Sequence, residues 1–319
     1  MFRTALIKNI ALAVLLVSTI VQNSNGRSLD SDTTYSVLIV TAHPDDDAMF
    51  SGSVYRLTHH LGGTVDLALI TDGAGGYRFS TLSEPIYGVN LSDSSVAAEY
   101  LPGIRKRELM AGGAIVGIRN YYFMDQPDSG KKLDPEPFLS GAWDSDFVTS
   151  RLRTLVEKND YDFIFALLPR EDTHAHHKAA TIYALDATKL VGDEGPLVLG
   201  AWITSADATG SFSFTTLKGY PQTAPLTAKP NFTFDRTAKF GVDDRLDYKI
   251  IVNWLIAEHK SQGTMQLLVN RGDIEEYWVL GSASDARLKK AERMFKKLQS
   301  SRKGGNAQGK VNIGPGKAA

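Results

Sequence analysis

Continuous apolar runs, rather than alternating ones, mark the strands that this sequence predicts. The runs Ser36–Thr41, Val65–Thr71 and Asp162–Leu168 consist mainly of aliphatic and aromatic residues. Such runs are typical of strands buried on both faces, as in a parallel sheet. A shorter strand is predicted at Tyr121–Met124, and a short apolar segment at Tyr277–Leu280.

Helical spacing of apolar residues separates these runs. It predicts helices at Ala48–His60, Gly103–Gly117, Asp146–Lys158, Asp247–His259 and Ser284–Leu298. Strands that alternate with helices imply right-handed crossovers between parallel strands. The predicted fold is therefore α/β: a Rossmann-like, doubly wound, mostly parallel sheet with helices on both faces.

The segment from about residue 200 to 240 has a different character, being rich in Thr, Ser, Pro and aromatic residues. We expect short antiparallel strands and loops here, added to one domain that covers residues 35–300. Its aromatic side chains could form a wall on which a sugar stacks, or they could belong to the core. The residues concerned are Trp202, Phe212, Phe214 and Tyr220.

Both ends of the chain differ from the predicted domain. Residues 1–26 have a positive start, an apolar run at Ile10–Val21 and small residues before Gly26, which is typical of a secretory signal peptide. We expect an exported protein, periplasmic or secreted, with an uncleaved membrane anchor as the alternative. No later stretch is long and apolar enough to span a bilayer, and the Gly- and Lys-rich residues 304–319 predict a disordered basic tail.

Composition limits the chemistry and the partners. The 319 residues include no cysteine, which excludes thiolate metal sites and thiol catalysis, so any metal must be held by His, Asp or Glu. Charges nearly balance, with 35 Lys and Arg against 36 Asp and Glu. From Lys289 onward nine basic residues face one acidic residue, so the remaining chain is net negative and a nucleic-acid partner is not expected. Nothing in the sequence indicates an oligomeric state.

Polar clusters follow the predicted strands at their carboxyl ends, where open parallel sheets bind ligands. These clusters are Ala42–Asp47, Thr71–Gly73 and Asp172–His177. His43 and Asp46 offer an imidazole and a carboxylate, and one imidazole from the last cluster would complete a three-ligand zinc site. Asp45 is then left over as a proton acceptor for water.

Plainer interpretations exist for each cluster. Three successive Asp residues suit a helix N-terminus, and a His-rich segment suits a solvated loop. Because both clusters fall at strand ends, we favour metal-assisted hydrolysis. The segment Gly73–Gly76 matches no nucleotide-binding pattern and is interpreted as a flexible loop beside the site.

The sequence Ala-His-Pro-Asp-Asp-Asp at 42–47 resembles the Ala-His-Pro-Asp-Asp-Glu motif of the LmbE/PIG-L family of zinc-dependent de-N-acetylases. The resemblance runs from about Val37 to His259. Four further segments resemble motifs of the family: Ile70–Gly73, Arg105–Glu108, His174–His177 and His259–Gln262.

The resemblance implies a Zn²⁺ ion held by His43, Asp46 and His177. It implies Asp45 as the general base, and His174 as the residue that stabilises the oxyanion or protonates the leaving amine. Arg105, Glu108 and Asp72 are weaker candidates that would line or brace the site.

Two departures from the family pattern affect this assignment. Asp47 replaces the usual Glu and shortens a side chain near the metal. Ala175 and His176 replace Pro and Asp, so His176 could compete with His177 as a ligand.

The implied activity is removal of acetyl from an N-acetylated amino sugar of the N-acetylglucosamine type, giving acetate and a free amine. Two alternatives stay open: an exported, non-catalytic metal- or glycan-binding protein, and a zinc hydrolase of another amide. The sequence does not identify the sugar, glycoconjugate or metabolite that serves as substrate.

Overall fold

A mixed sheet forms the centre of the protein. The computed structural model describes residues 34–130, 132–192 and 195–300, and within them seven strands form one sheet in the order β3-β2-β1-β4-β5-β9-β6. The five strands β3, β2, β1, β4 and β5 are parallel, and β9 and β6 extend the sheet with antiparallel pairing. The strands are β1 (Ser36–Thr41), β2 (Thr64–Thr71), β3 (Ile118–Gln126), β4 (Phe163–Leu167), β5 (Leu197–Thr204), β6 (Phe232–Asp235) and β9 (Ile274–Leu280).

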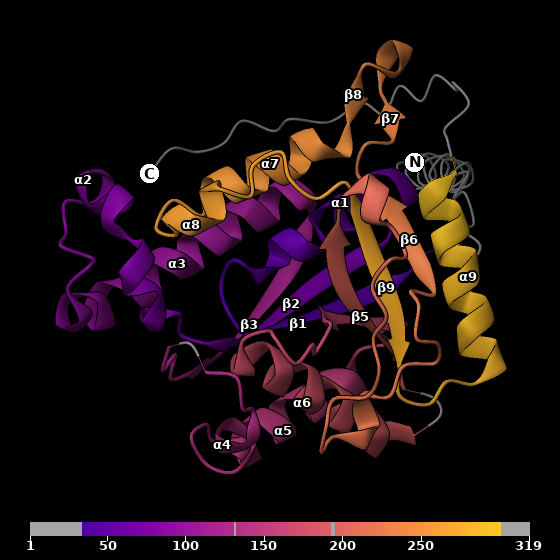
Figure 1. Ribbon diagram of the computed structural model, residues 1–319, viewed down its shortest axis with the longest axis horizontal. Coiled ribbons are helices and arrows are strands. Elements are labelled where there is room, and N and C mark those ends of the chain that lie inside the picture. Colours follow the sequence, from indigo (N-terminus) through magenta and orange to yellow (C-terminus); the bar gives the residue numbers. More distant parts are fainter. Residues whose placement is uncertain (1–33, 131, 193–194, 301–319) are drawn as a thin grey trace, which may run out of the picture. The chain divides into compact units, whose positions relative to one another are not determined.

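Helices cover both faces of this sheet (Figure 1). One face packs against α1 (Ser51–Tyr55), α3 (Ser94–Val116), α7 (Tyr248–Glu258) and α9 (Asp285–Gln299). The other face packs against α4 (Glu136–Leu139), α5 (Ser145–Lys158) and α6 (Ala175–Val191). Alternate residues of the strands supply the two cores, as Val37 and Ile39 face one layer and Leu38 and Val40 the other. The doubly wound α/β fold predicted from the sequence is confirmed.

Shorter elements complete the described chain. They include α2 (Glu84–Tyr87), α8 (Gly263–Gln266) and a small hairpin of β7 (Lys239–Phe240) and β8 (Leu246–Asp247). The segment predicted as one helix at Ala48–His60 is an irregular helical stretch with a turn at Phe50. It consists of a 3-10 turn η1 at Asp46–Met49, the helix α1, and the π-helical turn η2 at Arg56–His60.

The structure corrects the predicted elements at three places. Helix α3 begins at Ser94 rather than Gly103, because Asp93 caps it by accepting the backbone N–H of Ser95 and Val96, and Pro102 lies inside it. Helix α6 was not predicted. Strand β5 lies between β4 and β9, so the added region follows this strand instead of beginning at residue 200.

The aromatic residues considered as a wall for a sugar contact other side chains of the protein. The guanidinium of Arg170 lies 4.3 Å from the ring centre of Trp202 and 4.0 Å from that of Phe212. Phe214 belongs to the core, and the hydroxyl of Tyr220 donates to Glu136 at 2.8 Å. Phe214 is therefore a core residue, and Trp202 and Phe212 pack partly buried against the same core, while a sugar-binding role for Trp202, Phe212 and Tyr220 stays a prediction.

Two predictions concern residues outside the described ranges: the signal peptide at 1–26 and the basic tail at 304–319. The domain limits and the export of the protein therefore stay predictions. No helix among residues 34–130, 132–192 and 195–300 has the length and apolar character needed to cross a bilayer.

Candidate active site

The strand order reverses beside β1, and the polar clusters lie at this point. Strand β1 has β2 on one side and β4 on the other. The chain segments that follow β1 and β4 therefore leave two neighbouring strand ends in different directions. Such a switch point opens a crevice where α/β sheets bind ligands. Residues 42–47 follow β1, and His174 caps the N-terminus of α6 shortly after β4. The two clusters are therefore brought together by the topology.

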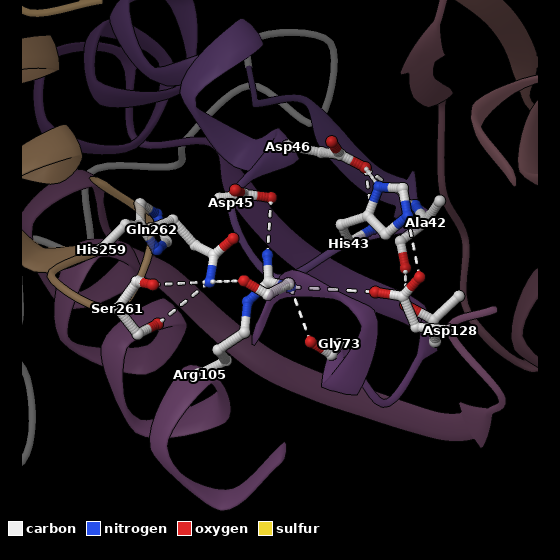
Figure 2. A network of polar contacts seen from close by, with 12 residues as sticks. Ala42, His43, Asp45, Asp46, Gly73, Arg105, Asp128, His259, Ser261 and Gln262 are labelled. Carbon is white, nitrogen blue, oxygen red and sulfur yellow. Dashed lines mark hydrogen bonds and ion pairs between the residues drawn. The ribbon is translucent and has the colours of Figure 1, made fainter. Parts of the chain in front are cut away.

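Asp46 holds the turn after β1 in its conformation. Its Oδ2 atom accepts the backbone N–H of Ala42 at 3.1 Å and of His43 at 2.8 Å (Figure 2). Asp46 is 8% exposed, so its carboxylate fixes the turn from within the protein. The other oxygen, Oδ1, lies 3.1 Å from Nε2 of His177.

Three donor atoms converge at this turn. Nδ1 of His43 lies 2.9 Å from Nε2 of His177 and 3.8 Å from Oδ2 of Asp46. Donor atoms about 2.1 Å from a tetrahedral zinc ion lie roughly 3.4 Å from each other, so this spacing fits such an ion. Two imidazoles and one carboxylate are also a donor set that suits zinc. The residues His43, Asp46 and His177 thus could hold a metal.

Asp45 lies beside this group without belonging to it. Its Oδ1 atom is 3.0 Å from Nη2 of Arg105, and Nη1 of Arg105 donates to the carbonyl of Gly73 at 2.8 Å (Figure 2). Arg105 is 3% exposed, which makes it a buried support for the carboxylate.

A cavity of about 260 Å³ contains these groups. His43, Asp45, Asp46, His174 and His177 all line it. Its other walls come from the loop after β2, from α3, from the loop after β3 and from the segment around α8. They include Gly75, Gly76, Arg78, Phe79, Arg105, Asp128, Gly130, Gln262, Thr264 and Met265. A larger cavity of about 670 Å³, between α6 and the end of β9, includes none of the five residues that the sequence singled out.

Burial keeps the imidazole of His174 neutral. Desolvation, together with the neighbouring His43 and His177, lowers the pKa of His174 to about 4. Nδ1 of His174 accepts the backbone N–H of His176 at 3.1 Å. In a neutral ring the proton must then be on Nε2, so His174 can act as a hydrogen-bond donor from that atom.

Residues 38–188 match the family model described as PIG-L: GlcNAc-PI de-N-acetylase. The chain has a PIG-L family domain. The match ends within α6, so it does not extend over residues 189–259, to which the resemblance was traced in the sequence.

One curated relative of this PIG-L domain is named as a deacetylase. It is the probable N-acetyl-alpha-D-glucosaminyl L-malate deacetylase 2 of Bacillus cereus, 28% identical over 171 residues that cover 53% of this chain and 68% of the relative.

Similar solved structures include enzymes with different reactions. The N,N'-diacetylchitobiose deacetylase from Pyrococcus horikoshii has a TM-score of 0.44 and 16% identity over 91% of this chain and 85% of its own. The 4-carboxy-2-hydroxymuconate hydratase from Pseudomonas putida has a TM-score of 0.48 and 14% identity over 78% of this chain and 98% of its own. Likenesses this low do not indicate a reaction for the PIG-L domain.

Asp128 is a site residue of the PIG-L domain that the sequence reasoning missed. Its Oδ1 atom lies 3.8 Å from Nε2 of His43, and its Oδ2 atom lies 3.9 Å from Nη1 of Arg105. Asp128 follows β3, so the rule of strand carboxyl ends that selected the other clusters could have found it.

The weaker candidates brace the site rather than form its centre. Oδ1 of Asp72 accepts the backbone N–H of Ala74 and Asp128, which joins the loops after β2 and β3. Glu108 accepts from the backbone and hydroxyl of Ser261 and from the hydroxyl of Tyr87.

Asp47, which replaces the Glu of the family motif, still reaches a partner. Its Oδ1 atom is 2.9 Å from Nε2 of His259, and both side chains are buried. Burial raises the pKa of Asp47, although the nearby His259 opposes that shift.

Proposed function

We propose that this protein is a zinc-dependent hydrolase that removes acetyl from an N-acetylated amino sugar and releases acetate and a free amine. The observation that carries the proposal is the convergence of His43, Asp46 and His177 beside Asp45 in one cavity. The PIG-L domain and the deacetylase name of the curated relative support the same reaction class.

In this proposal Nδ1 of His43, Nε2 of His177 and a carboxylate oxygen of Asp46 hold the metal. Zinc in such a site acts as a Lewis acid and lowers the pKa of water to about 7. The chain itself supplies the proton transfers and the fixed hydrogen-bond donors.

Asp45 moves the proton. One of its oxygens is engaged by Arg105, and Oδ2 accepts the proton from the water that attacks the acetamide carbonyl. The same oxygen then returns this proton to the amine nitrogen as the C–N bond breaks. Water thereby adds its oxygen to the acetyl group, and its protons are shared between the two products.

His174 stabilises the negative charge on the carbonyl oxygen. Because its pKa is lowered to about 4, the ring is neutral near pH 7 and has its proton on Nε2. A neutral N–H donor suits the oxyanion role, so we assign this role rather than protonation of the amine.

The substrate and the location of the protein belong to the proposal as well. An N-acetylglucosamine-type sugar in a glycan, glycoconjugate or metabolite would be deacetylated outside the cytoplasm if residues 1–26 direct export. A non-catalytic glycan-binding protein would need the metal ligands but not Asp45, and turnover of N-acetylated sugars distinguishes the two.

The proposed metal centre predicts which substitutions release zinc. Wild-type protein should hold about one zinc ion per chain, and His43→Ala or Asp46→Ala should each lose it together with activity, because each removes one of three ligands. Metal analysis after gel filtration checks this. His59→Ala, which changes an exposed histidine on η2, should keep the zinc. Full zinc content in both ligand variants would refute the metal centre.

Gly76 leaves room for Arg105, which supports Asp45, and for Gln262. A Cβ atom at this position would lie 2.6 Å from Nη1 of Arg105 and 2.7 Å from the side-chain amide of Gln262. Gly76→Ala should displace Arg105 and lower kcat/KM by about 10²-fold, the effect of a misplacement near 1 Å, while zinc stays bound. Gly103→Ala is the control, since its nearest contact would be Arg107 at 3.5 Å. Unchanged kcat/KM in Gly76→Ala would show that Arg105 does not support the reaction.

A further inference from the structure

Both ring nitrogens of His43 face another histidine. Nδ1 faces His177 at 2.9 Å, on the side of Asp46. Nε2, on the opposite edge of the ring, lies 3.0 Å from Nδ1 of His176. Successive residues of a helix point about 100° apart, which explains how His176 and His177 reach opposite edges of one imidazole.

His176 is held from behind by aromatic side chains. It is fully buried, and its ring centre lies 4.3 Å from that of Phe138 in a T-shaped arrangement and 5.1 Å from that of Trp143. Its Nε2 atom is buried and has no hydrogen-bond partner among the described residues. An unsatisfied buried nitrogen is destabilising, so stability alone does not explain a histidine here.

If Nδ1 of His43 ligates the proposed metal, the geometry gives the positions of the protons. A nitrogen that ligates a metal must have its lone pair free, so Nδ1 of His43 is unprotonated and the proton is on Nε2. That N–H points to Nδ1 of His176, which must accept it. Asp128 is the competing acceptor, but its Oδ1 atom lies 3.8 Å from Nε2 of His43, beyond hydrogen-bond distance.

We propose that His176 is a positioning residue for the metal ligand His43. By accepting the Nε2–H of His43, it fixes the tautomer and the ring orientation that direct Nδ1 toward His177 and Asp46. This inference rests on the proposed metal centre. Substituting such a partner of a ligating histidine typically weakens metal binding by about 10–100-fold.

A matched pair of variants separates the hydrogen bond from the packing. His176→Asn places an amide oxygen where Nδ1 lies, and His176→Leu has nearly the same size and shape without an acceptor. Both remove the same part of the ring near Phe138 and Trp143, so their melting temperatures should fall together. Chelator competition should give a zinc Kd near wild type for Asn and a Kd raised about 10–100-fold for Leu.

Three other results would overturn the proposal, and each points to a different cause. Equal Kd values for His176→Asn and His176→Leu, with zinc binding still stronger than in His177→Ala, would show that the hydrogen bond does not position His43. If both variants lose zinc as completely as the reference His177→Ala, His176 is itself a ligand. If His177→Ala binds zinc like wild type, the proposed metal centre fails, and the positioning role fails with it.

Imidazole nitrogen NMR of zinc-loaded wild-type protein provides a readout that needs no substitution. We expect the proton on Nε2 in both His43 and His176. A proton on Nδ1 of His176 would overturn the proposal even if the Leu variant does not fold.

Discussion

Asp45→Asn should lower kcat by about 10²–10⁴-fold while the protein keeps its zinc, because this is the usual contribution of a positioned general base. Asn has the size of Asp and still accepts from Arg105, whose guanidinium lies 3.0 Å from Oδ1. It cannot take a proton from water. KM should change little, since the loss falls on the transition state. Steady-state kinetics on an N-acetylated sugar, with metal analysis of the same samples, measure both quantities.

A second Asp→Asn change provides the control. Asp125 is the penultimate residue of β3, is 56% exposed and pairs with Lys106 on the surface. Its φ of 51° is a backbone conformation that Asn also adopts readily. Asp125→Asn should leave kcat unchanged. Wild-type kcat in Asp45→Asn would remove Asp45 from the mechanism and leave the binding-protein alternative to be tested.

The strands at the centre of the fold could be predicted because burial on both faces leaves a continuous apolar run. Such runs placed β1 and β4 nearly to the residue. Helix α6 escaped prediction for a related reason. It is buried around most of its surface, including Ala179, Ala184 and Lys178, so its sequence lacks the one-sided pattern that indicates a helix.

The site could be predicted where its residues are close in sequence. His43, Asp45 and Asp46 come from one turn, and the structure places them at one cavity. Which of His176 and His177 faces Asp46 depends on the rotation of α6 about its axis. Packing against neighbouring helices and strands determines that rotation. Spacing alone could not decide which histidine faces Asp46.

A buried ion pair anchors the helical stretch that follows the metal-binding turn. Oε1 of Glu275, on β9, accepts from the backbone of Gly52 at 2.9 Å and from Nε of Arg236 at 2.8 Å. Oε2 accepts from the backbone of Ser53 at 3.2 Å and from the hydroxyl of Tyr277 at 2.8 Å.

Arg236 holds the same stretch from its other side. Its Nη2 atom donates to the carbonyls of Ala48 and Met49, within η1. The pair thus binds the last turn before α1 and the first residues of α1 together, immediately after Asp46 and Asp47.

Glu275→Gln should therefore lower the free energy of unfolding by about 3–5 kcal/mol, because it leaves the buried Arg236 without a counter-charge. Gln preserves the size of the side chain but replaces one accepting oxygen with an NH2 group, so the effect combines the lost charge with the hydrogen bonds that this oxygen accepted. Urea unfolding of both proteins, with zinc removed by a chelator, measures the difference. Lys239→Gln at the exposed pair with Asp247 is the control, and its effect should stay within about 1 kcal/mol. If Glu275→Gln is no more destabilising than this control, the Glu275–Arg236 pair does not anchor the turn that presents His43 and Asp46 to the cavity.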